Sequence, residues 1–399
     1  MTCDVHADAA ATNPVVLLIT ETSDIYGAEQ WAHALAGGLA SQGFCVHFAR
    51  PHPQNAPPLD PRVRLLSFDT FDLDDPYGWV TDRSLTAALL DQVQPDLVVV
   101  SCATALANVG AREELVARGV PFISVHHLGG EEGFDLPCPQ ALSAAVAQVH
   151  AKASAVVGVS MDVVESLRHD YWLDDDRGGV IANGRPDVYF EDVDPENRLR
   201  VRHSLGLADD DVMVFTAARI HPAKGYQYQL DAIEQLRGGP AWDRLRFVWA
   251  GGTDALRRLR AVVLSRKLMG TVQLLGPRSD IIDLLDAADI FVLPSKQEGT
   301  PLAVIEAMAK GLPVITTPVN GIPALVGDTA WLLPDPNTNP HGTVTALADA
   351  VEHLAADREL RAQLGARARE RALTGWREQG MVDAYGSLIR EVLARRDAR

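Results

Sequence analysis

The sequence predicts an α/β protein made of two tandem Rossmann-like domains. Short, almost continuous apolar runs alternate with helical patterns, which is typical of a parallel sheet covered by helices on both faces. The alternation pauses over the polar stretch Ile181–Leu207 and then begins again. The length of 399 residues also suits two domains, because single domains usually hold about 100–200 residues.

The first alternation begins close to the amino terminus. Ala28–Gly43 is expected to form a helix, and Gly43 suits its end because glycine readily adopts the left-handed conformation found there. Apolar, β-branched segments indicate strands at Val15–Thr20, Cys45–Ala49, Asp96–Ser101, Pro121–His127 and Ala155–Ser160.

The second alternation follows the polar stretch, which we interpret as the interdomain linker. Strands are indicated at Val212–Ala218, Leu245–Gly252, Val272–Gly276, Asp289–Ser295 and Pro313–Pro318. After Thr329–Pro334 the pattern is helical to the last residue. Open α/β sheets bind ligands at the carboxyl ends of their strands, so we expect a ligand site in a cleft between the two domains.

The composition limits the possible partners. The net charge is −17, and residues 1–190 carry 25 acidic against 10 basic residues. This acidity argues against binding to nucleic acid or to an anionic membrane surface. The sequence has no apolar run of about 18 residues, no basic start of a signal peptide, and only four widely spaced cysteines. We therefore expect a cytoplasmic protein with reduced thiols and no stable membrane association.

Two glutamates, Glu298 and Glu306, flank the expected start of a helix in the second domain. A strand ends at Ser295, Thr300 is a good N-cap, and Pro301 suits the first helical position because its missing N–H is not needed there. A helix N-terminus attracts phosphate, whereas carboxylates accept hydrogen bonds from hydroxyl groups. The arrangement indicates a ligand that carries both phosphate and sugar hydroxyls.

A second signal lies at the end of the second domain's first strand. Arg219 and Lys224 flank a tight strand-to-helix turn, where the arginine fork and the lysine point charge can clamp a diphosphate. Both signals also have structural interpretations. Glu298 could lie at the surface, Glu306 could pair with Lys310 one turn along the helix, and the two cations could be a solvated pair.

The first domain adds weaker signals at strand ends. Gly27 permits a close backbone approach ahead of a helix, but the sequence has neither the GxGxxG pattern of NAD sites nor the P-loop of ATPases. His126 and His127 end a strand, where one of them could donate to a reacting sugar. They could also be structural, or bind a metal together with Glu131 or Glu132.

In combination, these elements resemble the retaining glycosyltransferases of family 4, which have the GT-B fold. The resemblance is strongest over Val212–Leu333 and weaker over Val15–Asp187. It implies two Rossmann-like domains that face a central cleft, and a C-terminal helix that crosses back to the first domain. Residues 1–190 with 376–399 would bind the acceptor, and residues 191–375 would bind the nucleotide-sugar donor.

The resemblance also implies roles for individual residues. Arg219 and Lys224 would hold the donor's diphosphate and stabilise it as the leaving group. Glu298 would contact hydroxyls of the transferred sugar without acting as a covalent nucleophile, and Glu306 would bind the ribose. His126 would touch the donor sugar near its anomeric carbon.

Backbone groups complete the expected donor site. Gly27 would let the first loop approach the phosphates, and the loop Gly276–Asp280 would face the base. Family members often have Glu-Gly-Phe-Gly-Leu where this chain has EGTPL, so Pro301 removes one N–H donor, and they often have glutamate where this chain has Ala324. The remaining donor-binding residues expected on this loop are Gly299, Thr300 and Leu302.

The resemblance implies a metal-independent hexosyltransferase that retains anomeric configuration. Its donor would be a nucleotide-diphosphate sugar, with UDP the expected nucleotide, and no separate cofactor would be needed. The acidic residues Glu131, Glu132 and Asp135 favour a soluble, amine-bearing acceptor such as an aminocyclitol or amino sugar. We expect a monomer or homodimer. The alternatives are a transferase of polysaccharide or glycolipid assembly, a nucleotide-sugar epimerase or hydrolase on the same fold, and a non-catalytic sugar-binding protein.

Overall fold

The computed structural model divides the chain into two compact units. Unit 1 comprises Met1–Asn183 with Glu378–Arg399, and unit 2 comprises Gly184–Arg377. The sequence analysis placed the divisions after residues 190 and 375, whereas the units divide after residues 183 and 377. The structure describes residues 13–20, 27–51, 58–68, 82–129, 140–252 and 255–398.

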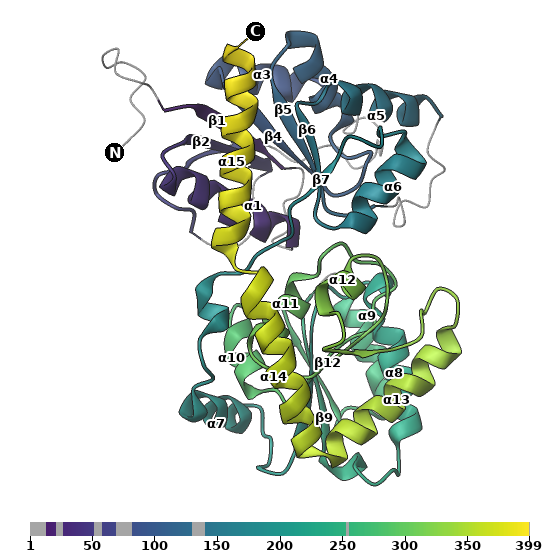
Figure 1. The fold of residues 1–399 in the computed structure, drawn as a ribbon. Coiled ribbons are helices and arrows are strands. Elements are labelled where there is room, and N and C mark those ends of the chain that lie inside the picture. The colour runs from purple at the N-terminus through teal and green to yellow at the C-terminus, as the bar shows by residue number, and fades with distance from the viewer. Residues whose placement is uncertain are drawn as a thin grey trace. The chain divides into compact units, whose positions relative to one another are not determined.

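Unit 1 is built on a parallel 7-stranded sheet with the order β3-β2-β1-β4-β5-β6-β7 (Figure 1). The chain runs from β1 outward through β2 to β3 and then returns to β4 on the other side of β1, so the strand order reverses between β1 and β4. The strands are Val15–Ile19 (β1), Cys45–Pro51 (β2), Arg64–Phe68 (β3), Leu97–Cys102 (β4), Phe122–His126 (β5), Ala155–Gly158 (β6) and Gly179–Val180 (β7).

The last helix of the chain packs on the first helix of unit 1 (Figure 1). The rings of Trp31 and Tyr385 meet edge to face with 5.5 Å between their centres. A Cβ atom at Gly38 would lie 2.4 Å from Val382, so glycine allows the close approach. The C-terminal helix returns to the first domain as predicted. The helices of unit 1 are Gly27–Ser41 (α1), Ser84–Val93 (α3), Val109–Arg118 (α4), Gln140–Lys152 (α5), Met161–Tyr171 (α6) and Glu378–Asp397 (α15).

Unit 2 is built on a parallel 6-stranded sheet with the order β10-β9-β8-β11-β12-β13, which reverses between β8 and β11. Its strands are Val212–Ala217 (β8), Leu245–Ala250 (β9), Val272–Gly276 (β10), Ile290–Leu293 (β11), Val314–Thr316 (β12) and Trp331–Leu332 (β13). Its helices are Pro195–Ser204 (α7), Tyr226–Leu236 (α8), Leu256–Ser265 (α9), Ile281–Ala287 (α10), Leu302–Ala309 (α11), Ile322–Val326 (α12), Pro340–Ala356 (α13) and Arg358–Gly375 (α14), with short 3-10 turns at Asp187–Phe190 (η1), Pro222–Lys224 (η2) and Trp242–Arg244 (η3).

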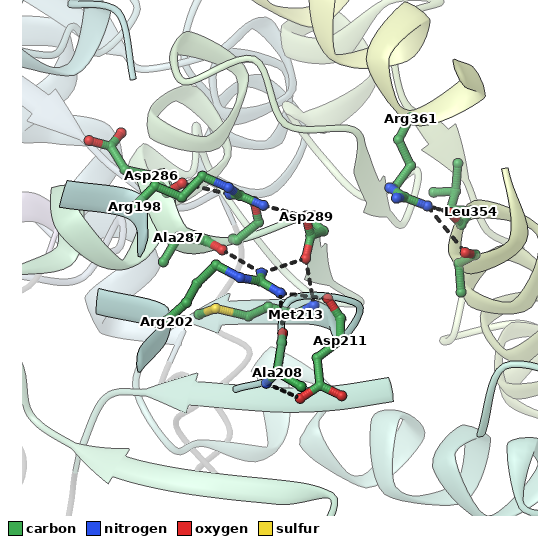
Figure 2. Close-up of polar contacts among 12 residues, drawn as sticks. Arg198, Arg202, Ala208, Asp211, Met213, Asp286, Ala287, Asp289, Leu354 and Arg361 are labelled. Atoms are coloured by element: carbon green, nitrogen blue, oxygen red, sulfur yellow. Dashed lines mark hydrogen bonds and ion pairs between the residues drawn. The ribbon is translucent and has the colours of Figure 1, made fainter. Parts of the chain in front are cut away.

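Helix α7 corrects the interpretation of residues 181–207 as a plain linker. Arg198 and Arg202 of this helix hold Asp289 at the start of β11 through ion pairs of 2.5 and 2.8 Å (Figure 2). The same two arginines donate to the backbone carbonyls of Asp286, Ala287 and Ala288 at the end of α10. The helix is thus attached by charge and hydrogen bonds, so its sequence lacks the apolar periodicity that predicts an amphipathic helix.

The strands expected from the sequence are confirmed to within a few residues. β3 and β7 were not predicted. β3 is an edge strand whose side chains are mostly exposed, and β7 contains only two residues, so neither has a continuous apolar run. No helix in the described part of the chain combines the length and apolar character that a membrane span requires. Cys45 is half-buried and Cys102 is buried, and Cys3 and Cys138 lie outside the described residues.

Candidate active site

The loops that follow β8 and β11 meet at the point where the strand order of unit 2 reverses. Gly225 has a φ of 71°, and a Cβ atom there would lie 2.0 Å from the carbonyl oxygen of Pro294. The backbone N–H of Lys296 donates to the carbonyl of Ala223 over 2.8 Å. Open α/β sheets bind ligands at such a reversal, so the contact between these two loops marks the candidate site.

Lys224 and Glu298 form the centre of this site. The Lys224 ammonium lies 2.6 Å from Oε1 of Glu298, and the Ser295 hydroxyl donates to the same oxygen over 2.7 Å. Glu298 is 6% exposed, so the interpretation of this residue as a surface glutamate is wrong. Its backbone N–H donates to the side chain of Asn320 over 3.2 Å, and Asn320 has a φ of 45°. Sequence reasoning missed Ser295 and Asn320 as parts of the site.

Two further polar groups lie on the same loop after β8 as Lys224. Arg219 is exposed, and His221 accepts a hydrogen bond from the N–H of Ala223 over 3.2 Å. Partial burial, followed by the positive charges of Arg219 and Lys224, lowers the pKa of His221. The loop therefore presents a positive region beside Glu298, which is what a diphosphate clamp requires. His221 lies between the two predicted cations in the sequence but was not predicted.

Helix α11 begins one residue later than expected. Pro301 occupies the N-cap with an extended ψ of 115°, and Leu302 is the first helical residue. Thr300 therefore lies one residue before the N-cap instead of occupying it. Gly299 and Thr300 lie in the loop between Glu298 and the helix, and the helix ends before Gly311, which has a φ of 73°.

Glu306 is buried but does not pair with Lys310. Its Oε1 lies 2.8 Å from Nη2 of Arg185, whereas the Lys310 ammonium lies 3.1 Å from Asp286. The intrahelical pair considered as an alternative is therefore wrong. Arg185 follows β7 in the segment NGRP, and the sequence offered no apolar or charge pattern that would connect it with α11.

The expected base-facing loop joins the neighbouring strand end. The N–H of Gly251, after β9, donates to the carbonyl of Gly276, at the end of β10, over 2.8 Å. Gly276 has a φ of 75°, and Arg278 pairs with Asp280 before α10. The carboxyl ends of β8, β10 and β11 thus carry the loops that were predicted to hold the donor.

His126 does not fit the expected contact with a donor sugar. Its side chain is 0% exposed, accepts or donates a hydrogen bond with Ser124 over 2.9 Å, and lies 3.2 Å from His150. Burial and the positive charge of Arg112 lower the pKa of His150 to about 3, and burial is also the main cause of the lowered pKa of His126. The neighbouring His127 packs on Trp31 with 4.8 Å between ring centres.

The glycine turn of the first unit leads into a buried ion pair. Gly27 is the exposed first residue of α1, and two residues later Glu29 accepts from Arg50 over 2.6 Å and from Thr20 over 3.1 Å. His33 lies 3.5 Å from the same carboxylate. This network was not predicted, because β2 was expected to end before Arg50.

A small pocket lies where the strand order of unit 1 reverses. Polar side chains that line it are Thr20, Asp82, Thr86 and Asn108. The expected acceptor-binding residues Glu131, Glu132 and Asp135 lie outside the described residues. In the described part of the chain, no group of three or more His, Cys, Asp or Glu side chains could hold a metal ion.

Comparison with known proteins places both units in one family. A family model described as glycosyl transferases group 1 matches residues 197–371, and a model described as glycosyltransferase family 4 matches residues 25–187. A crystal structure of Anabaena HepE in complex with UDP and glucose covers 94% of this chain and 99% of that chain with a TM-score of 0.77. At 19% identity this likeness concerns the fold.

Curated relatives match shorter stretches. A D-inositol 3-phosphate glycosyltransferase of Xylanimonas cellulosilytica is 32% identical over 65% of this chain and 63% of its own length. An alpha-D-kanosaminyltransferase of Streptomyces kanamyceticus is 29% identical over 60% of this chain and 61% of its own. A Salmonella typhimurium relative named for colanic acid biosynthesis matches 45% of each chain at 30% identity. The chain thus spans less than two thirds of the length of these relatives. With both family models and the GT-B architecture, the chain belongs to family 4 of the glycosyltransferases.

Proposed function

We propose that the protein is a retaining, metal-independent glycosyltransferase that moves a hexosyl-type sugar from a nucleotide-diphosphate sugar to an acceptor hydroxyl. The observation that carries this proposal is the contact of Lys224 and Ser295 with one oxygen of the buried Glu298, at the strand-order reversal of unit 2. A cation and a carboxylate are held together there on strand-end loops, where open α/β sheets bind ligands.

Each group of the site has a chemical task in this proposal. Lys224 has three donors, so it can contact Glu298 and a phosphate oxygen together, and the Arg219 fork can share the charge of the departing diphosphate. Glu298 accepts hydrogen bonds from hydroxyls of the transferred sugar, and Glu306 accepts them from the ribose. The departing phosphate takes the acceptor's proton on the same face of the sugar, so no covalent glycosyl-enzyme is formed.

The donor and acceptor assignments have separate support. The Anabaena neighbour was solved with UDP and glucose, which supports a UDP-sugar donor. For the acceptor we propose a soluble, amine-bearing hydroxyl compound, such as an aminocyclitol or amino sugar. The kanosaminyltransferase relative, the acidity of residues 1–190 and the carboxylate of Asp82 in the small pocket of unit 1 support this class.

A second candidate, transfer to a glycolipid or polysaccharide precursor, is favoured by the surface of α9. Arg257, Arg258 and Arg260 are exposed on this helix, and no carboxylate among the described residues forms a salt bridge with them. Leu264, on the same face as Arg257 and Arg260, is 65% exposed. A basic helix with exposed apolar side chains suits an anionic lipid surface.

A donor screen tests the proposed function. Thermal unfolding is measured with UDP-, GDP-, ADP- and TDP-sugars, and a ligand at a hundred times its dissociation constant should stabilise the protein by about 2.7 kcal/mol. The donor that binds is then incubated with and without aminocyclitols and amino sugars. Glycosylated product formed only with acceptor supports the proposal. Rapid epimer formation from the donor alone, or stabilisation by none of the sugars, contradicts it.

A further inference from the structure

The Arg185 side chain is held between an aromatic ring and a carboxylate of unit 2. Its Nη2 lies 2.8 Å from Oε1 of Glu306, and its guanidinium carbon lies 4.4 Å from the centre of the Tyr189 ring. Arg185 is 7% exposed and Glu306 is 5% exposed. Arginine is suited to this position, because its planar guanidinium stacks on an aromatic face while it binds a carboxylate in a fixed direction.

The backbone of Arg185 is also anchored. Its N–H donates to the carbonyl of Trp376 over 2.9 Å, and the residue forms an isolated parallel bridge with Arg377. Pro186 follows directly and fixes its own backbone φ. With its backbone and guanidinium both held, Arg185 provides a fixed reference for the flexible glutamate side chain on α11.

Tyr189 is a second group beside the Glu306 carboxylate. Burial, together with the negative charge of Glu306, raises the pKa of Tyr189 to about 12, so the phenol stays protonated at neutral pH. Arg185 and Tyr189 thus both lie beside the carboxylate, whose oxygens are acceptors of the kind that recognition of hydroxyl groups requires.

We propose that Arg185 is a positioning residue that fixes the Glu306 carboxylate for the ribose of the donor nucleotide and thereby sets a preference for ribonucleotides over 2′-deoxyribonucleotides. The inference rests on the proposed function, in which Glu306 binds the ribose. A carboxylate offers about four lone-pair directions, so the contact with Arg185 leaves acceptor capacity for hydroxyls. Without Arg185, the glutamate side chain can rotate, and the 2′-hydroxyl loses an acceptor of fixed position.

The test compares the binding of UDP and 2′-deoxy-UDP by calorimetry. The wild type should bind UDP about tenfold more tightly or better, as a hydrogen bond to a charged group provides. Arg185→Gln should reduce this ratio to about twofold or less, chiefly through weaker binding of UDP. Arg185→Lys keeps the charge without the fork and should give an intermediate ratio.

A matched variant controls for the loss of any buried arginine. Arg202 is equally buried in unit 2 but binds Asp289, so Arg202→Lys should lower the melting temperature without changing the UDP to 2′-deoxy-UDP ratio. An unchanged ratio in Arg185→Gln overturns this inference while the proposed function stands. If Arg185→Gln does not fold, Arg185→Lys takes its place, and a UDP to 2′-deoxy-UDP ratio equal to that of the wild type overturns this inference. Failure of the wild type to bind UDP, GDP or ADP overturns the proposed function and this inference together.

Discussion

At the scale of single residues, the histidines of unit 1 are the most unusual titratable groups. His126, His127 and His150 are buried, and burial lowers the pKa of His127 to about 4 and, with the charge of Arg112, that of His150 to about 3. The free side chain has a pKa near 6.5. These histidines are therefore neutral in the folded protein at neutral pH, where they accept or share hydrogen bonds within the core of the unit.

This burial predicts a loss of stability as the pH falls. Below about pH 6.5 the unfolded chain binds protons that the folded chain does not, so the free energy of unfolding decreases by up to ~1.4 kcal/mol per pH unit for each histidine. The loss continues down to the folded pKa values. His150→Gln should flatten the dependence between pH 6.5 and pH 5 in urea unfolding, whereas a change at the exposed His341 should not. An equal slope in the wild type and His150→Gln would rule out this account.

The sequence placed Lys224 and Glu298 on loops that follow two strands of one parallel sheet, and the structure brings their side chains 2.6 Å apart. Their roles toward a donor stay predictions. Arg185 could not be predicted, because its partner lies more than a hundred residues away and no local pattern connects the two. His126 was assigned by its place at a strand end, which does not reveal the face toward which a side chain points.

At the scale of secondary-structure elements, α7 depends on charged contacts. Asp289 accepts from Arg198, Arg202 and the backbone N–H of Met213, so one carboxylate joins α7 to the sheet (Figure 2). Asp194 caps the first turn of α7, but the helix has little apolar surface of its own. Hydrophobic periodicity therefore did not predict α7, whereas continuous apolar runs did predict the buried strands of both sheets.

Removal of that carboxylate should therefore be severe. Asp289→Ala removes the carboxylate partner of two arginines. Because the Arg202–Asp289 pair is nearly buried, at 7% and 13% exposed, the loss should approach the cost of about 3–5 kcal/mol that is typical of breaking a buried pair. The more exposed Asp283 lies 3.8 Å from Arg200, and Asp283→Ala should cost less than about 1 kcal/mol. Urea unfolding followed by tryptophan fluorescence measures both. Similar losses in the two variants would show that α7 is held by other contacts.

At the scale of the whole molecule, the chain passes between the units twice, and α15 belongs to the core of unit 1. Tyr385, Ile389 and Val382 are buried in the cluster that includes Trp31 of α1. The overall plan, with two Rossmann-like units and a returning last helix, was predictable because it follows from the alternation of apolar strands and helices along the chain. The two-residue β7 and the exposed β3 were not.

The division into units predicts separate effects of mutation. Tyr385→Ala should destabilise unit 1 by about 3–5 kcal/mol, as large-to-small changes of buried aromatic residues do. Unit 2 should keep its own transition and its nucleotide binding. Calorimetry with and without UDP distinguishes the units, because only the transition of unit 2 should rise with the ligand. A fall of the UDP-sensitive transition in Tyr385→Ala would contradict the assignment.

The most direct test of the proposed donor site is acceptor-dependent release of nucleoside diphosphate by Glu298→Ala. The variant should be slower by about a hundredfold or more, since in the proposed function it removes a group that contacts the reacting sugar. Glu298→Gln preserves the size of the side chain if the smaller residue destabilises the fold, and Glu359→Ala, at an exposed position of unit 2, should keep wild-type turnover. Near-normal turnover in a folded Glu298 variant would contradict the central claim that this carboxylate holds the donor sugar.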